Sequence, residues 1–72
     1  MILSERLKQL RIERNLVQKQ VYEAIRMSSL GYRRYEYGKR EPGYKHLIAL
    51  SNFYNVSLDY LVGRTDNPKM NV

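Results

Sequence analysis

The stretch from residue 18 to residue 40 restricts the fold of this chain more than any other. It holds two short helical patterns with a break between them. In the first, Val21 and Ile25 stand four apart, and in the second, Tyr32 and Tyr35 stand three apart. Each spacing places both side chains on one face of a helix. Only two residues are left for the turn, so we expect the two helices to cross steeply.

Residues that start and stop helices mark both ends of the second pattern. Ser28 stands at the N-cap position, and Gly38 stands where glycine commonly ends a helix. Two short helices that cross at a tight turn are the layout of a helix-turn-helix motif, whose second helix enters the major groove of DNA. The sequence therefore predicts this motif.

Four segments in order resemble one known family. Residues 35–42, YEYGKREP, resemble the YExGKRxP signature of the phage-repressor and Cro-type (xenobiotic-response-element) helix-turn-helix family. The LKxLR pattern at residues 7–11, Gln18 at the start of the second helix, and NVSLDYLVG at residues 55–63 match at the family's spacing. The resemblance covers about residues 3–63 and implies a compact, all-α, five-helix, repressor-like DNA-binding domain. Helices 2 and 3 would form the helix-turn-helix.

Length and apolar spacing fit one small domain. With 72 residues and no cysteine, its core must rely on helix packing, without disulfides or a thiolate metal site. Apolar periodicity predicts further helices at residues 3–14, 44–54 and 58–62. We assign residues 1–64 to a helix-turn-helix DNA-binding domain and residues 65–72 to a flexible C-terminal tail.

Several classes of protein are disfavoured. No apolar run approaches the ~20 residues that span a bilayer, and the N-terminal residues lack the apolar segment of a signal peptide, so we expect a cytoplasmic protein with no membrane contact. The chain has one histidine, His46, which we place at the surface or boundary, and no carboxylate pair spaced for acid–base chemistry. We expect no enzyme activity, no cofactor and no metal.

The charge of the chain favours a polyanionic partner. The net charge is +6 and the pI is about 9.8. Residues 26–45 hold six basic and two acidic side chains, a local balance of +4. A solvated basic face would give the same total charge. The concentration of positive charge on the expected reading helix nevertheless favours double-stranded DNA as the partner.

The outward side chains of the third helix, together with its N-terminal end, are the candidates for base contacts. They are Ser28, Ser29, Leu30, Arg33 and Arg34. Arginine is the commonest reader of guanine, and a leucine can pack on a thymine methyl group. Either arginine could read a base, bind a phosphate or form only a surface salt bridge; the family's pattern makes Arg34 the better base reader.

The resemblance also implies phosphate contacts that position the protein without reading sequence. In the family, the glutamine at the first turn of the second helix and the loop after the third helix contact the DNA backbone. The corresponding residues are Gln18, Tyr37, Lys39 and Arg40.

One structural ion pair follows from the same resemblance. In the relatives, a basic residue of the first helix pairs with the acid of the YExGK motif, so we expect Arg11 to pair with Glu36. The alternative is two separate surface charges.

Two residues depart from the family's pattern. Tyr22 replaces a small residue at the contact between the two helices of the motif, and Arg26 replaces a glycine expected at positive φ. Our hypothesis is that Gly31 makes room for the Tyr22 ring.

The expected function is a sequence-specific, double-stranded-DNA-binding transcriptional regulator, a repressor that reads the major groove of a palindromic operator. One helix reads few base pairs, so we expect a homodimer, formed in solution or only on DNA. In the fifth helix we expect Leu58, Leu61 and Val62 to close the core and Tyr60 to make the dimer contact. The alternative is a protein-interaction module such as a toxin-neutralising antitoxin.

Overall fold

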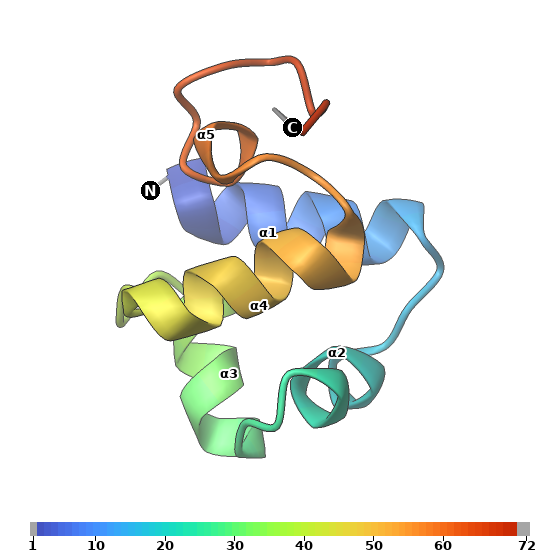
Figure 1. Cartoon of the computed structure of the whole chain (residues 1–72). Coiled ribbons are helices and arrows are strands. Elements are labelled where there is room, and N and C mark those ends of the chain that lie inside the picture. Colours follow the sequence, from blue (N-terminus) through green and yellow to red (C-terminus); the bar gives the residue numbers. More distant parts are fainter. Residues whose placement is uncertain (1, 71–72) are drawn as a thin grey trace.

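The computed structural model describes residues 2–70, which form five α-helices joined by short loops (Figure 1). The helices are α1 (Ile2–Glu13), α2 (Gln18–Ala24), α3 (Ser29–Glu36), α4 (Tyr44–Tyr54) and α5 (Leu58–Leu61). No strand occurs within residues 2–70, and the predicted all-α, five-helix fold is confirmed. None of the helices in this range is long and apolar enough to cross a membrane.

The first helix runs through the middle of the fold. It packs against α3 on one side and against α5 on the other, while α2 packs on α3 and α4 packs on α5. Figure 1 shows α2 and α3 crossing steeply at one end of the molecule, as the short link between them predicts. Helix α3 is thus held by two neighbours and still forms an edge of the domain.

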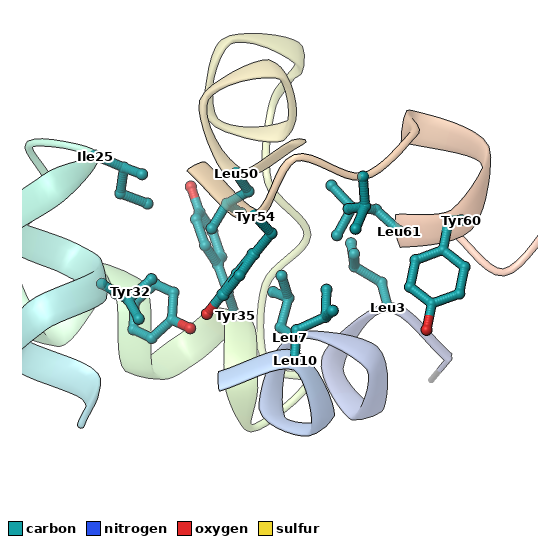
Figure 2. Close-up of a cluster of buried hydrophobic side chains, with 12 residues drawn as sticks. Leu3, Leu7, Leu10, Ile25, Tyr32, Tyr35, Leu50, Tyr54, Tyr60 and Leu61 are labelled. Carbon is teal, nitrogen blue, oxygen red and sulfur yellow. The ribbon is translucent and has the colours of Figure 1, made fainter. Parts of the chain in front are cut away.

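The core lies where the inner faces of all five helices meet (Figure 2). Val21 and Ile25 are buried, and so are Tyr32 and Tyr35, so both spacings in the helix-turn-helix segment mark core-facing residues. The buried apolar side chains are Leu3, Leu7, Leu10, Val21, Ile25, Tyr32, Tyr35, Leu50, Tyr54, Val56, Tyr60 and Leu61.

Side-chain caps fix the starts of the short helices. The Ser28 hydroxyl accepts a hydrogen bond from the backbone N–H of Gly31 at 3.1 Å, and the Ser57 hydroxyl begins α5 in the same way. At the start of α2, Val17 has no side-chain acceptor. The Gln20 side chain compensates in part, because its Oε1 accepts from the Val17 N–H at 2.8 Å.

The fifth helix turns a different face to the core from the one expected. Tyr60 and Leu61 are buried, whereas Leu58 is 43% and Val62 38% exposed. The expectation that Leu58 and Val62 close the core is therefore wrong, as is the placement of Tyr60 outside it. The Tyr60 ring packs on α1, with the Arg6 guanidinium carbon 3.8 Å from the ring centroid. Because that contact covers its ring, Tyr60 is not a free surface for a second copy.

The hypothesis about Gly31 is also wrong. A Cβ atom at this position would meet Ser28 Oγ at 3.0 Å and Met27 Cε at 3.1 Å, not the Tyr22 ring. Tyr22 lies instead against Tyr32, with ring centroids 6.5 Å apart and tilted planes. Gly31 thus leaves room for Ser28, the N-cap of α3, and for the side chain of Met27.

Within residues 2–70, three residues other than glycine lie in the left-handed region. They are Asn15 at φ 55°, Arg26 at φ 59° and Asn55 at φ 55°. Asparagine tolerates this conformation better than other side chains do. The prediction of positive φ at Arg26 is confirmed. Because arginine lacks the tolerance of asparagine, the turn carries local strain.

The described part of the tail folds back on the domain. The Pro68 carbonyl accepts from the Ser57 N–H at 2.9 Å, and Arg6 Nη2 lies 3.6 Å from Asp66 Oδ1. The domain boundary after residue 64 and the flexibility of residues 65–72 stay predictions.

Candidate nucleic-acid interface

Helix α3 has one buried face and one exposed face. Tyr32, Tyr35 and Glu36 are at most 6% exposed and hold α3 against the rest of the fold. On the opposite side, Arg33 and Arg34 face solvent and Leu30 is 61% exposed. Among residues 2–70, neither arginine takes part in a salt bridge, so both guanidinium groups keep their donors available.

The two serines at the start of α3 differ in their surroundings. Ser28 is exposed, but its hydroxyl oxygen is engaged as the helix cap. It can still donate its own proton, because a hydroxyl both donates and accepts. Ser29 is half-buried at the first position of the helix. Both residues lie at the end of α3 that reaches base edges in helix-turn-helix complexes.

The loop after α3 is tied closely to the helix. The N–H groups of Lys39 and Arg40 both reach the Arg34 carbonyl, at 2.9 and 3.3 Å. Gly38 makes this possible with φ of +72°, a conformation that a side chain would strain. Tyr37, 63% exposed, and the side chains of Lys39 and Arg40 are therefore exposed on a loop whose backbone is hydrogen-bonded to the last turn of α3.

Arg11 and Glu36 meet at the base of α3. Arg11 donates from Nε to Glu36 Oε2 at 2.8 Å and from Nη2 to Oε1 at 3.1 Å. Its Nη1 also donates to the Leu16 carbonyl at 3.1 Å. Side-chain exposure is 15% for Arg11 and 1% for Glu36, so the ion pair is largely shielded from water.

The pKa of Glu36 is set by two opposed influences. Burial raises the pKa of this carboxyl, and the hydrogen bonds and positive charge of Arg11, with further contributions from the neighbouring Tyr32 hydroxyl and from Gln18, outweigh that effect. The net result is a pKa below its ordinary value. Glu36 therefore stays ionised at neutral pH, and its negative charge balances the positive charge of Arg11.

Gln18 has a partner that the sequence did not reveal. Its Nε2 donates to Glu36 Oε1 at 3.3 Å, which links the start of α2 to the end of α3. The side chain is half-buried at the first residue of the helix. Glu36 thus joins three helices, through Arg11 on α1 and Gln18 on α2.

Two tyrosine hydroxyls lie near this ion pair without hydrogen-bond partners among the described residues. They belong to Tyr32 and Tyr54, and Figure 2 shows them pointing toward each other. Burial raises the pKa of both groups, that of Tyr54 to about 12. Both tyrosines are therefore neutral and serve mainly as large core side chains.

A second tyrosine contact joins α3 to α4. The Tyr35 hydroxyl and His46 Nδ1 are 2.7 Å apart, and their rings are tilted with centroids 5.7 Å apart. His46 is half-buried at this boundary between the two helices. Among residues 2–70, no group of three or more histidine, cysteine or acidic side chains is placed to hold a metal ion.

A family model described as "Helix-turn-helix" matches residues 7–61, a span that includes both helices of the motif and the Arg11–Glu36 pair. The chain belongs to this helix-turn-helix family. The family resemblance stated from the sequence is thereby confirmed. No solved structure gives a significant match.

Curated helix-turn-helix proteins align with most of this chain. The uncharacterized transcriptional regulator YqaE of Bacillus subtilis (strain 168) is 41% identical over 69 residues, which cover 96% of this chain and 60% of that protein. The regulator ImmR of the same organism is 38% identical, with 99% and 56% covered. The transcriptional activator BcrR of Enterococcus faecalis is 36% identical, with 86% and 30% covered.

The chain spans about 60% or less of the length of these helix-turn-helix relatives. Their names describe transcriptional regulators and no enzyme, in agreement with the prediction from the sequence. Two are named without a direction of regulation and one is named an activator.

Proposed function

We propose that this chain is the DNA-binding domain of a sequence-specific transcriptional regulator, with α3 as the helix that reads the major groove of double-stranded DNA. The observation that carries the proposal is the division of α3 into a buried face and an exposed face that presents Leu30, Arg33 and Arg34. The names of the relatives support it. Because DNA is the target, we propose the cytoplasm of a bacterium as the compartment.

Base contacts and phosphate contacts have separate places in this proposal. Arg34 reads a base, Arg33 reads a base or binds a phosphate, and Leu30 packs on a thymine methyl group. Ser28 and Ser29 contact base edges at the N-terminal end of the helix.

Phosphate contacts fall to residues next to α3. The exposed loop side chains of Tyr37, Lys39 and Arg40 hold the DNA backbone. The Tyr37 N–H donates to the Arg33 carbonyl, and the N–H groups of Lys39 and Arg40 donate to the Arg34 carbonyl, which keeps the three residues in register with the helix. Gln18 contributes a further phosphate contact from the start of α2, through the second N–H of its Nε2, which its bond to Glu36 leaves free.

We propose a two-fold dimer on a palindromic operator, formed in solution or on DNA. Support for a contact surface comes from three exposed apolar side chains on α4, α5 and the α5 C-cap: Ile48 at 45%, Leu58 at 43% and Val62 at 38%. These three side chains replace Tyr60, which is buried, as the proposed dimer contact. A groove lies beside Ile48 and Leu58, with Met70 of the tail on its wall. Repression is the proposed outcome, as the phage-repressor resemblance implies.

Selection of DNA from a random duplex pool tests this function. The expected result is a palindromic consensus with half-sites about one helical turn apart, since the two recognition helices of a dimer lie on one side of the duplex. Binding should weaken as salt rises, because phosphate contacts release counterions. Recovery of no consensus, with binding that vanishes at moderate salt, would contradict the proposal.

A toxin-neutralising antitoxin or another protein-capture module is the second candidate. The same exposed apolar groove beside Ile48 and Leu58 favours it. The molar mass of the chain, measured by light scattering with and without the selected duplex, distinguishes the regulator from the interaction module. A two-fold complex on DNA supports the regulator; a monomer without sequence preference supports the interaction module.

A further inference from the structure

The turn that leads into α3 is strained at one exposed position. Arg26 has φ 59°, a conformation that costs free energy for a residue with a Cβ atom and that glycine adopts freely. Two backbone hydrogen bonds fix this turn. The Arg26 N–H donates to the Glu23 carbonyl at 3.2 Å, and the Met27 N–H donates to the Tyr22 carbonyl at 2.8 Å. Strain of this kind clusters at functional sites, so an exposed arginine that keeps it points to a role outside the fold.

Within residues 2–70, the Arg26 side chain forms no ion pair that would offset the strain. It is exposed, and it takes part in none of the salt bridges of this range. Glu23 lies in the same turn and is exposed as well, yet the two side chains are not paired in the described part of the chain. The guanidinium group therefore keeps its donors available for a partner outside the chain.

Arg26 also supplies the positive charge at this end of α3. It is the only basic residue between Lys19 and Arg33, and the acidic Glu23 lies in the same interval. One basic and one acidic side chain make residues 20–32 neutral, and loss of Arg26 would leave them with a net negative charge. The proposed function places this end of the helix against a polyanion, which a net negative charge would repel.

The cations next to α3 lie at both of its ends. Arg26 precedes the helix, and Lys39 and Arg40 follow it in the next loop. Figure 1 shows the link from α2 at one end of α3 and the loop toward α4 at the other. Eight residues make a helix of about 12 Å, and the major groove of DNA is about as wide. Cations at the two ends can therefore reach phosphates that neither end reaches alone.

We propose that Arg26 binds a DNA phosphate beside the N-terminal end of α3 and thereby positions this end of the helix in the major groove. Arginine suits the contact, because its planar guanidinium can donate two parallel hydrogen bonds to phosphate oxygens. Such a contact is independent of base sequence. The inference rests on the proposed DNA-binding function and extends its contact surface to the turn of the motif.

Loss of one phosphate contact has a defined signature in salt. When Arg26 is neutralised, the slope of log affinity against log salt should become shallower by about 0.9 per domain, because one phosphate fewer is neutralised on binding. Affinity at about 0.1 M salt should fall on the order of 10-fold, since a charge-assisted hydrogen bond is lost. The factor should be the same on every duplex, because phosphates carry no sequence information.

The test compares the wild type with Arg26→Asn and Arg26→Lys on one mixed-sequence duplex of about 20 base pairs, between about 50 and 200 mM salt. Asparagine is neutral and tolerates positive φ, whereas lysine keeps the charge at the strained position. The expected result is a shallower slope for Arg26→Asn and an unchanged slope for Arg26→Lys.

Lys69→Asn is the matched control for net charge. It removes one exposed positive charge from the tail, which lies on the far side of α1 from α3 (Figure 1). Its salt slope should equal that of the wild type, because long-range attraction alone neutralises no particular phosphate.

Equal slopes for the wild type and Arg26→Asn would overturn the inference and leave the proposed function standing. Equal losses in Arg26→Asn and Lys69→Asn would show that net charge alone is responsible and would overturn it too. A slope for Arg26→Lys as shallow as that of Arg26→Asn would also overturn it, because the charge would then make no contact. Absence of duplex binding by the wild type at low salt would overturn both proposals.

Stability distinguishes this role from a structural one. Arg26→Gly relieves the strain and removes the cation, so it should unfold at a higher urea concentration than the wild type and yet bind the duplex more weakly. An unchanged affinity in a more stable Arg26→Gly would contradict the phosphate contact. A loss of both stability and affinity would assign the arginine a structural role and overturn the inference.

Ethylation interference locates the contact on a duplex that carries the sequence recovered by selection. The expected result is one phosphate per half-site whose ethylation weakens binding of the wild type and leaves binding of Arg26→Asn unaffected, because the variant no longer contacts it. The same set of interfering phosphates for both proteins would overturn the inference.

Discussion

Arg11 and Glu36 are 25 residues apart in the sequence and are joined in the fold by two hydrogen bonds of 2.8 and 3.1 Å. The bonds connect the first helix to the last residue of α3. Gln18 shares the same carboxylate from α2. The orientation of α3 is therefore set by a polar contact as well as by apolar packing.

Removal of Arg11 should be strongly destabilising. Arg11→Met leaves the Glu36 carboxylate, 1% exposed, without its cation. We expect the free energy of unfolding at pH 7 to fall by about 3–5 kcal/mol, the usual result of breaking a buried ion pair from one side. Asp59→Asn is the matched control, because its pair with Arg64 is 3.9 Å long and exposed. The control should lose less than about 1 kcal/mol in urea unfolding followed by circular dichroism. Equal losses would contradict the role of burial.

The pH dependence of the free energy of unfolding should differ between the wild type and Arg11→Met. The folded-state pKa of Glu36 lies below its unfolded value, so the wild type keeps this contribution above pH ~4.3 and loses it as pH falls further. In Arg11→Met, burial without a cation raises the pKa of the carboxyl, so protonation relieves the variant. Unfolding at pH 7, 5 and 4 should show the difference between wild type and variant narrowing with acidification. A constant difference would refute this account.

Loss of the Tyr54 hydroxyl should be tolerated better than loss of the Tyr35 hydroxyl. Tyr54 is fully buried and its hydroxyl has no hydrogen-bond partner within residues 2–70. Tyr54→Phe should leave stability unchanged or raise it by up to about 1 kcal/mol. Tyr35→Phe loses the 2.7 Å bond to His46 and should cost about 0.5–1.5 kcal/mol. Thermal and urea unfolding of the two variants gives the comparison, and the reverse order would contradict it.

The turn of the motif should gain stability from glycine. Arg26 has φ 59°, which glycine adopts without contact between Cβ and the backbone. Arg26→Gly should raise the free energy of unfolding by about 0.5–1 kcal/mol, after allowance for the greater freedom of glycine in the unfolded chain. Asn15→Gly, at φ 55°, is the control and should gain less, because asparagine already tolerates this region. A destabilised Arg26→Gly would show that the arginine side chain makes a contact that outweighs the strain.

Two exposed basic residues should respond differently on DNA. Replacing Arg34 by alanine should relax one base position and cost about 1–3 kcal/mol on the selected operator. Replacing Lys39 by alanine should weaken all duplexes alike and lower the salt slope by about 1. Both side chains are exposed, so neither variant should alter folding. Binding titrations on operator and scrambled duplexes decide the matter, and identical specificity profiles would contradict these roles.

Local spacing predicted the parts of the fold that depend on one element at a time. The pairs Val21 with Ile25 and Tyr32 with Tyr35 turn inward, and Arg26 has positive φ as expected. The two inward pairs follow from helix periodicity, whereas the positive φ of Arg26 was expected from the glycine that the family's pattern has at this position. The approach of Arg11 to Glu36 came from the family resemblance, since no local rule connects the two residues.

Contacts between distant elements were beyond such rules. A helix of four residues is too short for periodicity to define its inner face, so Tyr60 and Leu58 were assigned to the wrong sides. The bonds from Gln18 to Glu36 and from Tyr35 to His46 depend on where two helices end in space. Sequence supplied the polar groups; only the fold brought them within 3.3 Å.

The division of α3 into a buried and an exposed face has an evolutionary consequence. The residues that anchor the helix, Tyr32, Tyr35 and Glu36, are buried and contribute little to the exposed face that is proposed to meet DNA. The residues that face outward, Leu30, Arg33 and Arg34, contribute little to stability. Three outward codons can therefore mutate without loss of the folded domain. Such a scaffold can acquire new target sites by drift, and a designer could exchange the same three positions to redirect it.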